Sequence, residues 1–402
     1  MMMTKSAWLL SVGAALGLGI GAMSLFLSPA QTVAEVSDIE VSDTEVSDPV
    51  AETVGTWQSA PMTTIPLKAE QMGFSGSGQQ LMILTAERDM LQIWNTQTSE
   101  VLTELPVDEE TRFEAVAINE AGTQVAAIVQ TLPTNRLELW LWDLEAEAPL
   151  WRQSLGIVQS QFWDAEAFFI DTLTTVVFRP DDEAILTQVS LGFGPADGPA
   201  DTRIRLHEVG TGKVMQTLEI PAEATPGNQF EFSPDGEFLA GTSYVPPISG
   251  LGLHFAQAID VWHLSEGTHR WQIRPDEDDF SLVDMVFTHD GTLRVLAQNF
   301  YDIRLDTWDV QSEQRIERVT ELPDIDRTDG LGHLSPDGKD YFVRSDVAGT
   351  RLINTQTLSV TPLEAYVDRV AVFNSTGDYL AVTSLEEIHI FSRVEPTIKV
   401  EP

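Results

Sequence analysis

Apolar and polar residues alternate along most of this chain in short runs, which is the pattern of half-buried β-strands. Leu91-Gln92-Ile93-Trp94 is one such run, and Tyr379-Leu380-Ala381-Val382 is an apolar strand of the same length. Polar turns built on Asp, Gly or Pro separate the runs. The pattern therefore predicts an all-β protein made of many short strands.

The strands form one unit that is repeated seven times between Phe74 and Phe373. Each unit has an apolar strand, a polar turn, a second strand, a connection of variable length and a third strand that usually ends near Trp. Units of about 50 residues with several short strands are typical of propeller blades, so the repeat predicts a seven-bladed β-propeller. The residues just before the first turns are Phe74, Ile118, Phe178, Phe232, Phe287, Leu334 and Phe373.

The first turns have the chemistry of tight hairpins. Two of them read Ser-Pro-Asp-Gly, at Ser233 to Gly236 and at Ser335 to Gly338. Pro fixes one backbone dihedral, Asp bonds to its own backbone, and Gly accepts a positive φ. Each turn is therefore expected to join the first two strands of a blade.

These turns, with the Trp-Asp pairs at Trp142 and Trp308, resemble the WD-repeat family over about residues 70 to 392. The chain is also similar to periplasmic propellers of the TolB type. It lacks the family's Gly-His pair ahead of the first strand, since Gly332-His333 lies directly against Leu334. The family's buried Asp, His, Ser and Trp network is therefore not expected. The resemblance implies the fold and no function, because propellers host many functions.

Two segments are candidates for the strand that closes the ring. In WD-repeat proteins an N-terminal strand commonly completes the last blade, and Thr56 to Leu67 stands in the right place for this. Thr397 to Val400 is the alternative outer strand. We expect closure by the N-terminal segment.

The chain is strongly acidic, with 62 Asp and Glu against 23 Lys and Arg in 402 residues and a formal charge of -39. Such a charge repels nucleic acid and anionic lipid, so neither is an expected partner. A hydrophobic content of 43% is enough for a large core, which places the acid on the surface. No Cys is present, so contacts between blades must hold the ring closed without disulfides.

The N-terminus predicts export. An uncharged apolar run from Ser6 to Leu27 follows Lys5, and residues 1–30 are expected to form a hydrophobic helix that is a signal peptide or a membrane anchor. Residues 31–54 contain Glu-Val-Ser-Asp three times and are expected to be a disordered acidic linker. The propeller, residues 55–402, should then be periplasmic or extracellular and touch the membrane only through the N-terminal segment.

The long connections between strands are expected on one face of the ring, where binding residues usually sit on a rigid scaffold. Exposed apolar side chains there would form a surface for a protein partner; folded inward, they would plug the mouth of the ring instead. The candidate binding residues are Trp163, Phe168, Phe169, Val245, Ile248, Leu251 and Phe255.

Acidic side chains in two of these connections are candidate calcium ligands, because hard oxygen groups bind this ion. The second group fails the calcium-loop pattern at one position, since Asp329 stands where the loop requires Gly. No cofactor is expected, and Ca²⁺ is the alternative. The candidates are Asp276, Asp278, Asp279, Asp324, Asp326 and Asp329.

No catalytic residue is predicted. The seven His residues show no metal-ligand spacing, and Gly73 to Ser77 lacks the last Gly of a nucleophile elbow. The expected function is a non-catalytic, extracytoplasmic scaffold that binds a protein of the cell envelope. The alternative is an envelope hydrolase or lyase on the same fold that uses acidic loop residues, with or without calcium.

Overall fold

The computed structural model describes residues 56–146, 148–158, 174–191, 201–222, 224–245, 256–274, 281–298, 303–320, 322, 332–345, 349–365, 367 and 370–394. The chain divides into two compact units, Met1–Glu52 and Thr53–Pro402, and all described residues belong to the second. The expected helix in 1–30 and linker in 31–54 lie outside the described residues. Within the described ranges, no helix has the length and apolar character needed to cross a membrane.

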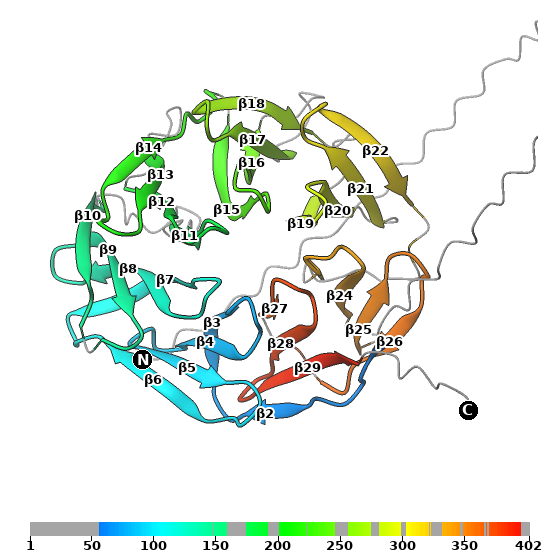
Figure 1. Ribbon diagram of the computed structural model, residues 1–402, viewed down its shortest axis with the longest axis horizontal. Coiled ribbons are helices and arrows are strands. Elements are labelled where there is room, and N and C mark those ends of the chain that lie inside the picture. The colour runs from blue at the N-terminus through cyan, green and yellow to red at the C-terminus, as the bar shows by residue number, and fades with distance from the viewer. Residues whose placement is uncertain are drawn as a thin grey trace, which may run out of the picture. The chain divides into compact units, whose positions relative to one another are not determined.

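The second unit is an all-β, seven-bladed propeller, as the repeat predicted (Figure 1). All seven sheets are antiparallel, and six of them follow the order of the chain from the central axis outward. The strands of blades 1 to 3 are β3 (Ala69–Phe74), β4 (Gln80–Thr85), β5 (Met90–Asn95), β6 (Val101–Pro106), β7 (Thr111–Ile118), β8 (Gln124–Thr131), β9 (Arg136–Asp143), β10 (Trp151–Ile157), β11 (Thr174–Phe178), β12 (Ala184–Ser190), β13 (Thr202–Glu208) and β14 (Val214–Thr217). Those of blades 4 to 6 are β15 (Thr225–Phe232), β16 (Phe238–Val245), β17 (Ala256–His263), β18 (Thr268–Ile273), β19 (Ser281–Phe287), β20 (Leu293–Gln298), β21 (Ile303–Asp309), β22 (Gln314–Val319), β23 (Gly332–Leu334), β24 (Asp340–Ser345), β25 (Gly349–Asn354) and β26 (Val360–Pro362).

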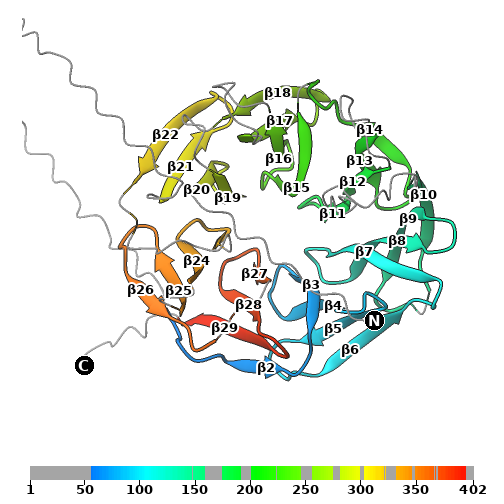
Figure 2. The same cartoon turned by 180° about the vertical axis from the view of Figure 1, so that it is seen from behind.

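Blade 7 combines the two ends of the described chain. It contains β27 (Ala371–Phe373), β28 (Tyr379–Thr383) and β29 (Ile388–Val394), and both β1 (Thr56–Trp57) and β2 (Thr63–Ile65) pair with β29. Figure 2 shows the blue strand β2 beside the red strand β29. The N-terminal closure is therefore confirmed. The alternative segment, Thr397 to Val400, lies outside the described residues.

The hydrophobic core is divided among the junctions between blades. The described residues form seven clusters of buried side chains, and each cluster joins two neighbouring blades. At the junction of blades 3 and 4, for example, Leu186 packs in one cluster with Phe230 and Trp262. The apolar side chains that alternate along each strand are thus buried against a neighbouring blade. Contacts between blades hold the ring together, as the absence of Cys required.

The first turn of each blade is five residues long, as in residues 233–237 and 335–339. The left-handed position of the turn is Gly in six blades, such as Gly236 with φ 71°, and Asp182 with φ 58° in blade 3. A side chain at Gly236 would contact the preceding blade, since its Cβ would lie 3.2 Å from Cδ of Arg179. Glycine is needed there both for its backbone conformation and for the close approach of two blades.

Candidate functional site

The first turns of blades 7, 1, 2 and 3 are hydrogen-bonded to one another beside the central opening. The Gly76 amide donates to the Glu120 carbonyl at 2.9 Å, and the Ser375 hydroxyl donates to Glu120 Oε1 at 2.7 Å. The Asp182 carboxylate accepts from the Glu120 amide at 3.2 Å and from Asn119 Nδ2 at 3.0 Å. The turns of blades 7, 1, 2 and 3 therefore form one connected arc. We call the face of the ring that carries all seven first turns the turn face.

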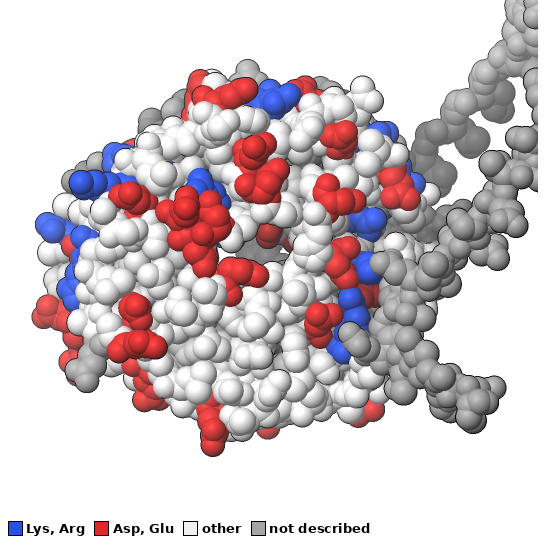
Figure 3. All heavy atoms as spheres, in the orientation of Figure 1, with Lys and Arg blue, Asp and Glu red and all other residues white. Residues whose placement is uncertain are grey.

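Exposed carboxylates give the turn face a negative charge. Figure 3 shows acidic side chains gathered around the central opening. Arg179 is paired with two of these acids, at 2.6 Å to Asp181 and 3.5 Å to Glu183. Burial opposes ionisation of Asp181, but the hydrogen bond and charge of Arg179 outweigh it and lower the pKa of this carboxyl. The exposed acids of these turns include Glu120, Asp181, Glu183, Asp235, Glu237 and Asp290.

The wall of the central channel is made by the innermost strands, and polar side chains connect one strand to the next. The Thr175 hydroxyl on β11 donates to the Asn228 carbonyl on β15 at 2.9 Å. Asp284 Oδ2 on β19 accepts from the Leu334 amide on β23 at 2.6 Å. Each bond satisfies a backbone group on the inner edge of a sheet that no further strand covers.

A pair of carboxyl groups, Glu231 on β15 and Asp284 on β19, lies in this wall. Asp284 is buried and also accepts a hydrogen bond from Gln229, and His333 Nδ1 is 3.9 Å from its Oδ2. Burial raises the pKa of Asp284, and the charge of His333 opposes this effect. Burial and the charge of Asp284 raise the pKa of Glu231 to about 8. Glu231 therefore carries a proton at neutral pH, unlike an ordinary glutamate.

Acids on the other side of the channel have a different environment. Glu114 on β7 is buried but lies 2.5 Å from Arg112 Nε and 3.3 Å from Arg88 Nη1. Arg88 also pairs with Glu70. Among the described residues, no Lys or Arg pairs with Glu231 or Asp284. The two unusual acids of the channel are thus the ones without arginine partners.

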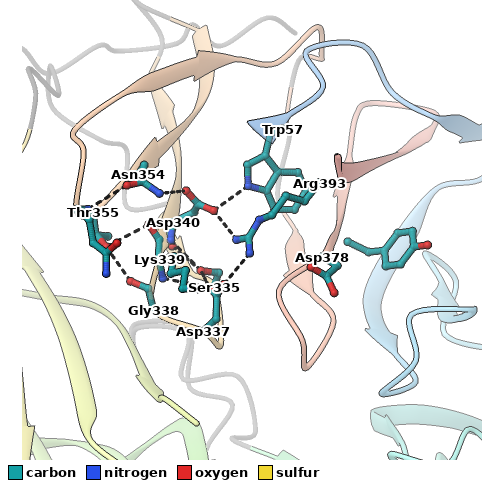
Figure 4. Close-up of polar contacts among 12 residues, drawn as sticks. Trp57, Ser335, Asp337, Gly338, Lys339, Asp340, Asn354, Thr355, Asp378 and Arg393 are labelled. Atoms are coloured by element: carbon teal, nitrogen blue, oxygen red, sulfur yellow. Dashed lines mark hydrogen bonds and ion pairs between the residues drawn. The ribbon is translucent and has the colours of Figure 1, made fainter. Parts of the chain in front are cut away.

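A second polar cluster joins the closing strand to blade 6 (Figure 4). Asp340 Oδ2 accepts from Trp57 Nε1 at 2.9 Å and from Arg393 Nη2 at 2.5 Å, while Oδ1 accepts from Asn354 Nδ2 at 3.0 Å. Arg393 Nη1 also reaches Asp337 at 2.6 Å. Burial opposes ionisation of Asp337, but hydrogen bonds from Arg393 and Ser335 and the charge of Arg393 lower its pKa. These bonds tie the closing strand and β29 to blade 6, while Arg393 Nε is buried without a hydrogen-bond partner among the described residues.

Two small hollows lie on the outer side of the ring. One, of about 270 Å³, lies between blades 1 and 2 and includes Leu105, Trp142 and Leu144 in its lining. The other, of about 190 Å³, lies beside the closing strand and is lined by Trp57, Asp340 and several hydroxyl side chains. Neither hollow contains the carboxyl pair of the channel.

Almost all of the residues proposed from sequence lie outside the described residues. This applies to the binding candidates Trp163, Phe168, Phe169, Ile248, Leu251 and Phe255, and to the calcium candidates Asp276, Asp278, Asp279, Asp324, Asp326 and Asp329. Val245 is the last residue of β16 and pairs with Ala256, so the connection 246–255 leaves the sheet at the end opposite to the first turn. The described ranges contain no group of three or more His, Cys, Asp or Glu that could hold a metal ion. The assignments to these residues stay predictions.

Sequence reasoning missed Glu231 and Asp284. The signal was present, because each is an acid inside an innermost strand, next to Phe230 and Phe232 in one case and to Met285 in the other. Simple alternation treats such an acid as facing water. In a propeller the innermost strand faces a narrow channel, so an acid there is desolvated.

Comparisons with known proteins support the fold. The chain matches no protein-family profile, and a search of curated proteins found no match. Among solved structures, a chain in the crystal structure of the mitotic checkpoint complex is similar, with a TM-score of 0.54 and 11% identity over 90% of this chain and 99% of that chain. At this identity the likeness shows the fold alone. Together with the seven sheets it confirms a WD-repeat-like propeller.

Proposed function

We propose that this protein is an extracytoplasmic, non-catalytic scaffold that binds another protein of the cell envelope. The observation that carries the proposal is the unequal construction of the two faces. The first turns are all five residues long, and those of blades 7, 1, 2 and 3 are hydrogen-bonded to their neighbours, whereas the connections at the opposite ends of the strands differ widely in length. A rigid ring with variable loops on one face is a common arrangement for binding.

The N-terminal sequence supports the location. Lys5 precedes the apolar run, and acidic residues follow it, so the positive-inside rule orients the propeller away from the cytoplasm. The high negative charge of the chain disfavours nucleic acid as a partner. Apolar residues in the long connections suit a protein partner.

The proposal is tested by affinity capture from envelope extracts with the full chain and two variants. In the first variant, residues 246–255 are replaced by a short turn between the paired residues Val245 and Ala256. In the second, Glu183→Gln and Glu237→Gln reduce the charge of the turn face. Captured proteins are identified by mass spectrometry, and the Kd of the purified partner is then measured for all three proteins.

We expect one partner that is lost with the shortened loop and kept with the double Gln variant. Loss with the Gln variant alone would move the binding surface to the turn face. Failure to capture any protein beyond those held by an unrelated acidic protein would reject the scaffold.

The second candidate function is a hydrolase or lyase of the envelope. It is favoured by one observation, the raised pKa of Glu231 beside Asp284, because enzymes that use two carboxyl groups often keep one protonated near neutral pH. Turnover of a panel of glycosides and esters, abolished by Glu231→Gln, would support the enzyme over the scaffold. The same panel assayed with and without Ca²⁺ tests the calcium dependence.

A further inference from the structure

The hollow beside the closing strand lies between blades 6 and 7. Most of its lining comes from β24, β25 and β26 of blade 6 and from β1, which belongs to blade 7. On blade 6, Asp340 is opposite Asn354 and Leu352 is opposite Thr361, while Asn354 follows Leu352 by two positions. Residues in this register share one side of a sheet. Leu352 packs in the cluster that joins blades 6 and 7, so all four side chains lie on the side of the sheet that faces blade 7.

The hollow has the size for a small organic molecule. A single bound water needs only about 10–15 Å³ of accessible space, and the hollow has about 190 Å³. It is therefore too large to be the site of one water or one ion. Pockets for drug-sized molecules begin at about 300 Å³. The space between these limits suits a ligand of about one ring.

The charges around the hollow favour a neutral ligand. Asp340 is the one ionisable group among the described residues that line it, and it is 3% exposed. Its Oδ2 already accepts from Arg393 Nη2 at 2.5 Å and from Trp57 Nε1 at 2.9 Å (Figure 4). A cation would therefore meet the Arg393 guanidinium next to the carboxylate, and an anion would meet the carboxylate itself. One member of this ion pair repels either kind of charge.

Several hydrogen-bonding groups of the lining remain available to a ligand. Asp340 Oδ1 accepts from Asn354 Nδ2 at 3.0 Å, which leaves a second acceptor position on Oδ1 and a second hydrogen on Nδ2. In the described part of the chain, the hydroxyls of Thr56 and Thr361 make no hydrogen bond to the protein. The hollow thus offers an acceptor beside a donor, together with hydroxyls that both donate and accept.

A sugar ring matches these groups. Each of its hydroxyls both donates and accepts, so two neighbouring hydroxyls can donate to Asp340 Oδ1 and accept from Asn354 Nδ2. The C–H groups of the ring are apolar, and Trp57 and Leu352 supply apolar atoms to the same lining. An apolar wall with a few convergent polar groups is the usual construction of a small-molecule site.

We propose that the hollow between blades 6 and 7 binds one neutral sugar unit, through hydrogen bonds to Asp340, Asn354 and Thr361 and apolar contact with Trp57. Since Trp57 lies on the closing strand, a ligand bound to the folded ring stabilises its closure and raises Tm. The inference does not depend on the proposed function, because this hollow lies at the end of blade 6 that carries the first turn, away from the long connections.

The test measures binding to the full chain by isothermal titration calorimetry and by Tm. The sugar probes are the methyl glycosides of glucose, galactose, mannose and N-acetylglucosamine; propylammonium and inorganic phosphate are the cationic and anionic probes. We expect at least one glycoside to bind and to raise Tm. Binding of no glycoside would overturn the proposal.

The site is located with the variant Thr361→Val, which keeps the shape of the side chain and removes its hydroxyl. We expect it to weaken the affinity for the sugar about tenfold, the effect of losing one hydrogen bond. Thr103→Val is the matched control, since Thr103 also lies on the outermost strand of its blade and lines the other hollow. Equal affinity of Thr361→Val and the unchanged protein, or an ion whose binding requires the Thr361 hydroxyl, would refute the sugar site.

A second measurement needs no variant of the site. Trp57 lines this hollow and Trp142 lines the other, so their indole N–H signals in NMR spectra report on the two hollows separately. We expect the Trp57 signal to shift as the glycoside is added and the Trp142 signal to stay in place. A shift of Trp142 alone, or of neither signal, would contradict the proposal.

Discussion

The closing strand depends on one side chain, Trp57. It lies on β1 and is 7% exposed, so almost all of its surface is buried at the junction of blades 6 and 7. Its ring meets Phe373 edge to face at 5.9 Å, the Arg393 guanidinium is 5.3 Å from it, and its Nε1 donates to Asp340 at 2.9 Å. Trp57 therefore contacts blade 7 through Phe373 and Arg393, and blade 6 through Asp340.

We expect Trp57→Ala to lower the free energy of unfolding by about 4 kcal/mol, the usual cost of truncating a buried aromatic side chain to Ala. Trp57→Phe keeps most of the packing and removes only the hydrogen bond to a charged acceptor, so we expect about 2 kcal/mol. Asp340 keeps its bonds to Arg393 and Asn354 in both variants, which limits the penalty for the unpaired oxygen.

The assay is urea unfolding of the full chain, followed by far-UV circular dichroism because the substitution itself changes tryptophan fluorescence. Thr56→Ala is the matched control, since Thr56 is the exposed neighbour on the same strand and should change stability by less than about 0.5 kcal/mol. A loss below about 1 kcal/mol for Trp57→Ala would refute the argument. It would mean that blade 7 closes without the first strand.

Three further predictions test other parts of the ring. Deleting residues 55–67 should lower Tm throughout the domain, whereas deleting 396–402 should leave it unchanged; the reverse pattern in thermal melts would reject the N-terminal closure. Hydrogen bonds and the charge of Arg393 lower the pKa of Asp337 despite burial, so its stabilisation is present above pH 3.8 and is lost as the pH falls through the lower folded-state value. Asp337→Asn should therefore reduce Tm at pH 7 and flatten the loss of Tm below pH 4, and an unchanged acid limb in the melting curves would contradict this. Burial lowers the pKa of His207, which bonds to Thr187 and the Gly212 carbonyl. Below pH 6.5 the unfolded chain therefore binds a proton at this position more readily than the folded protein, and the resulting loss of stability should be absent in His207→Gln. Equal Tm changes of the two proteins between pH 7 and 5 would count against this reasoning.

The number of blades and the closure could be predicted because their signals are local or in phase. Each first turn carries its own turn chemistry, so seven weak matches in the same order within each unit were enough to count the blades. The closing segment was placed from its position just ahead of the first unit and from the resemblance to WD-repeat proteins. The structure adds that this segment forms two short strands, β1 and β2, in place of one.

The polar clusters could not be predicted, because their members are far apart in sequence. Trp57 and Asp340 are 283 positions apart, and nothing near either residue indicates the other. The same holds for Glu231 and Asp284, whose unusual environment exists only after two innermost strands come together. Alternation gives the side of the strand on which a residue lies, but not what the neighbouring blade places against it.

The two faces differ in how much change each can accept. Six of the first turns place Gly at a positive φ, and at two of them a Cβ would also press on a side chain of the neighbouring blade: at Gly122 it would lie 2.6 Å from Oε1 of Gln80, and at Gly338 2.8 Å from Cγ2 of Thr288. Substitution of either glycine would strain the turn and displace the neighbouring side chain. Lengthening a loop at the opposite ends of the strands costs little free energy. New binding surfaces can therefore arise on that face without loss of the ring, which is the physical reason to look for the partner there first.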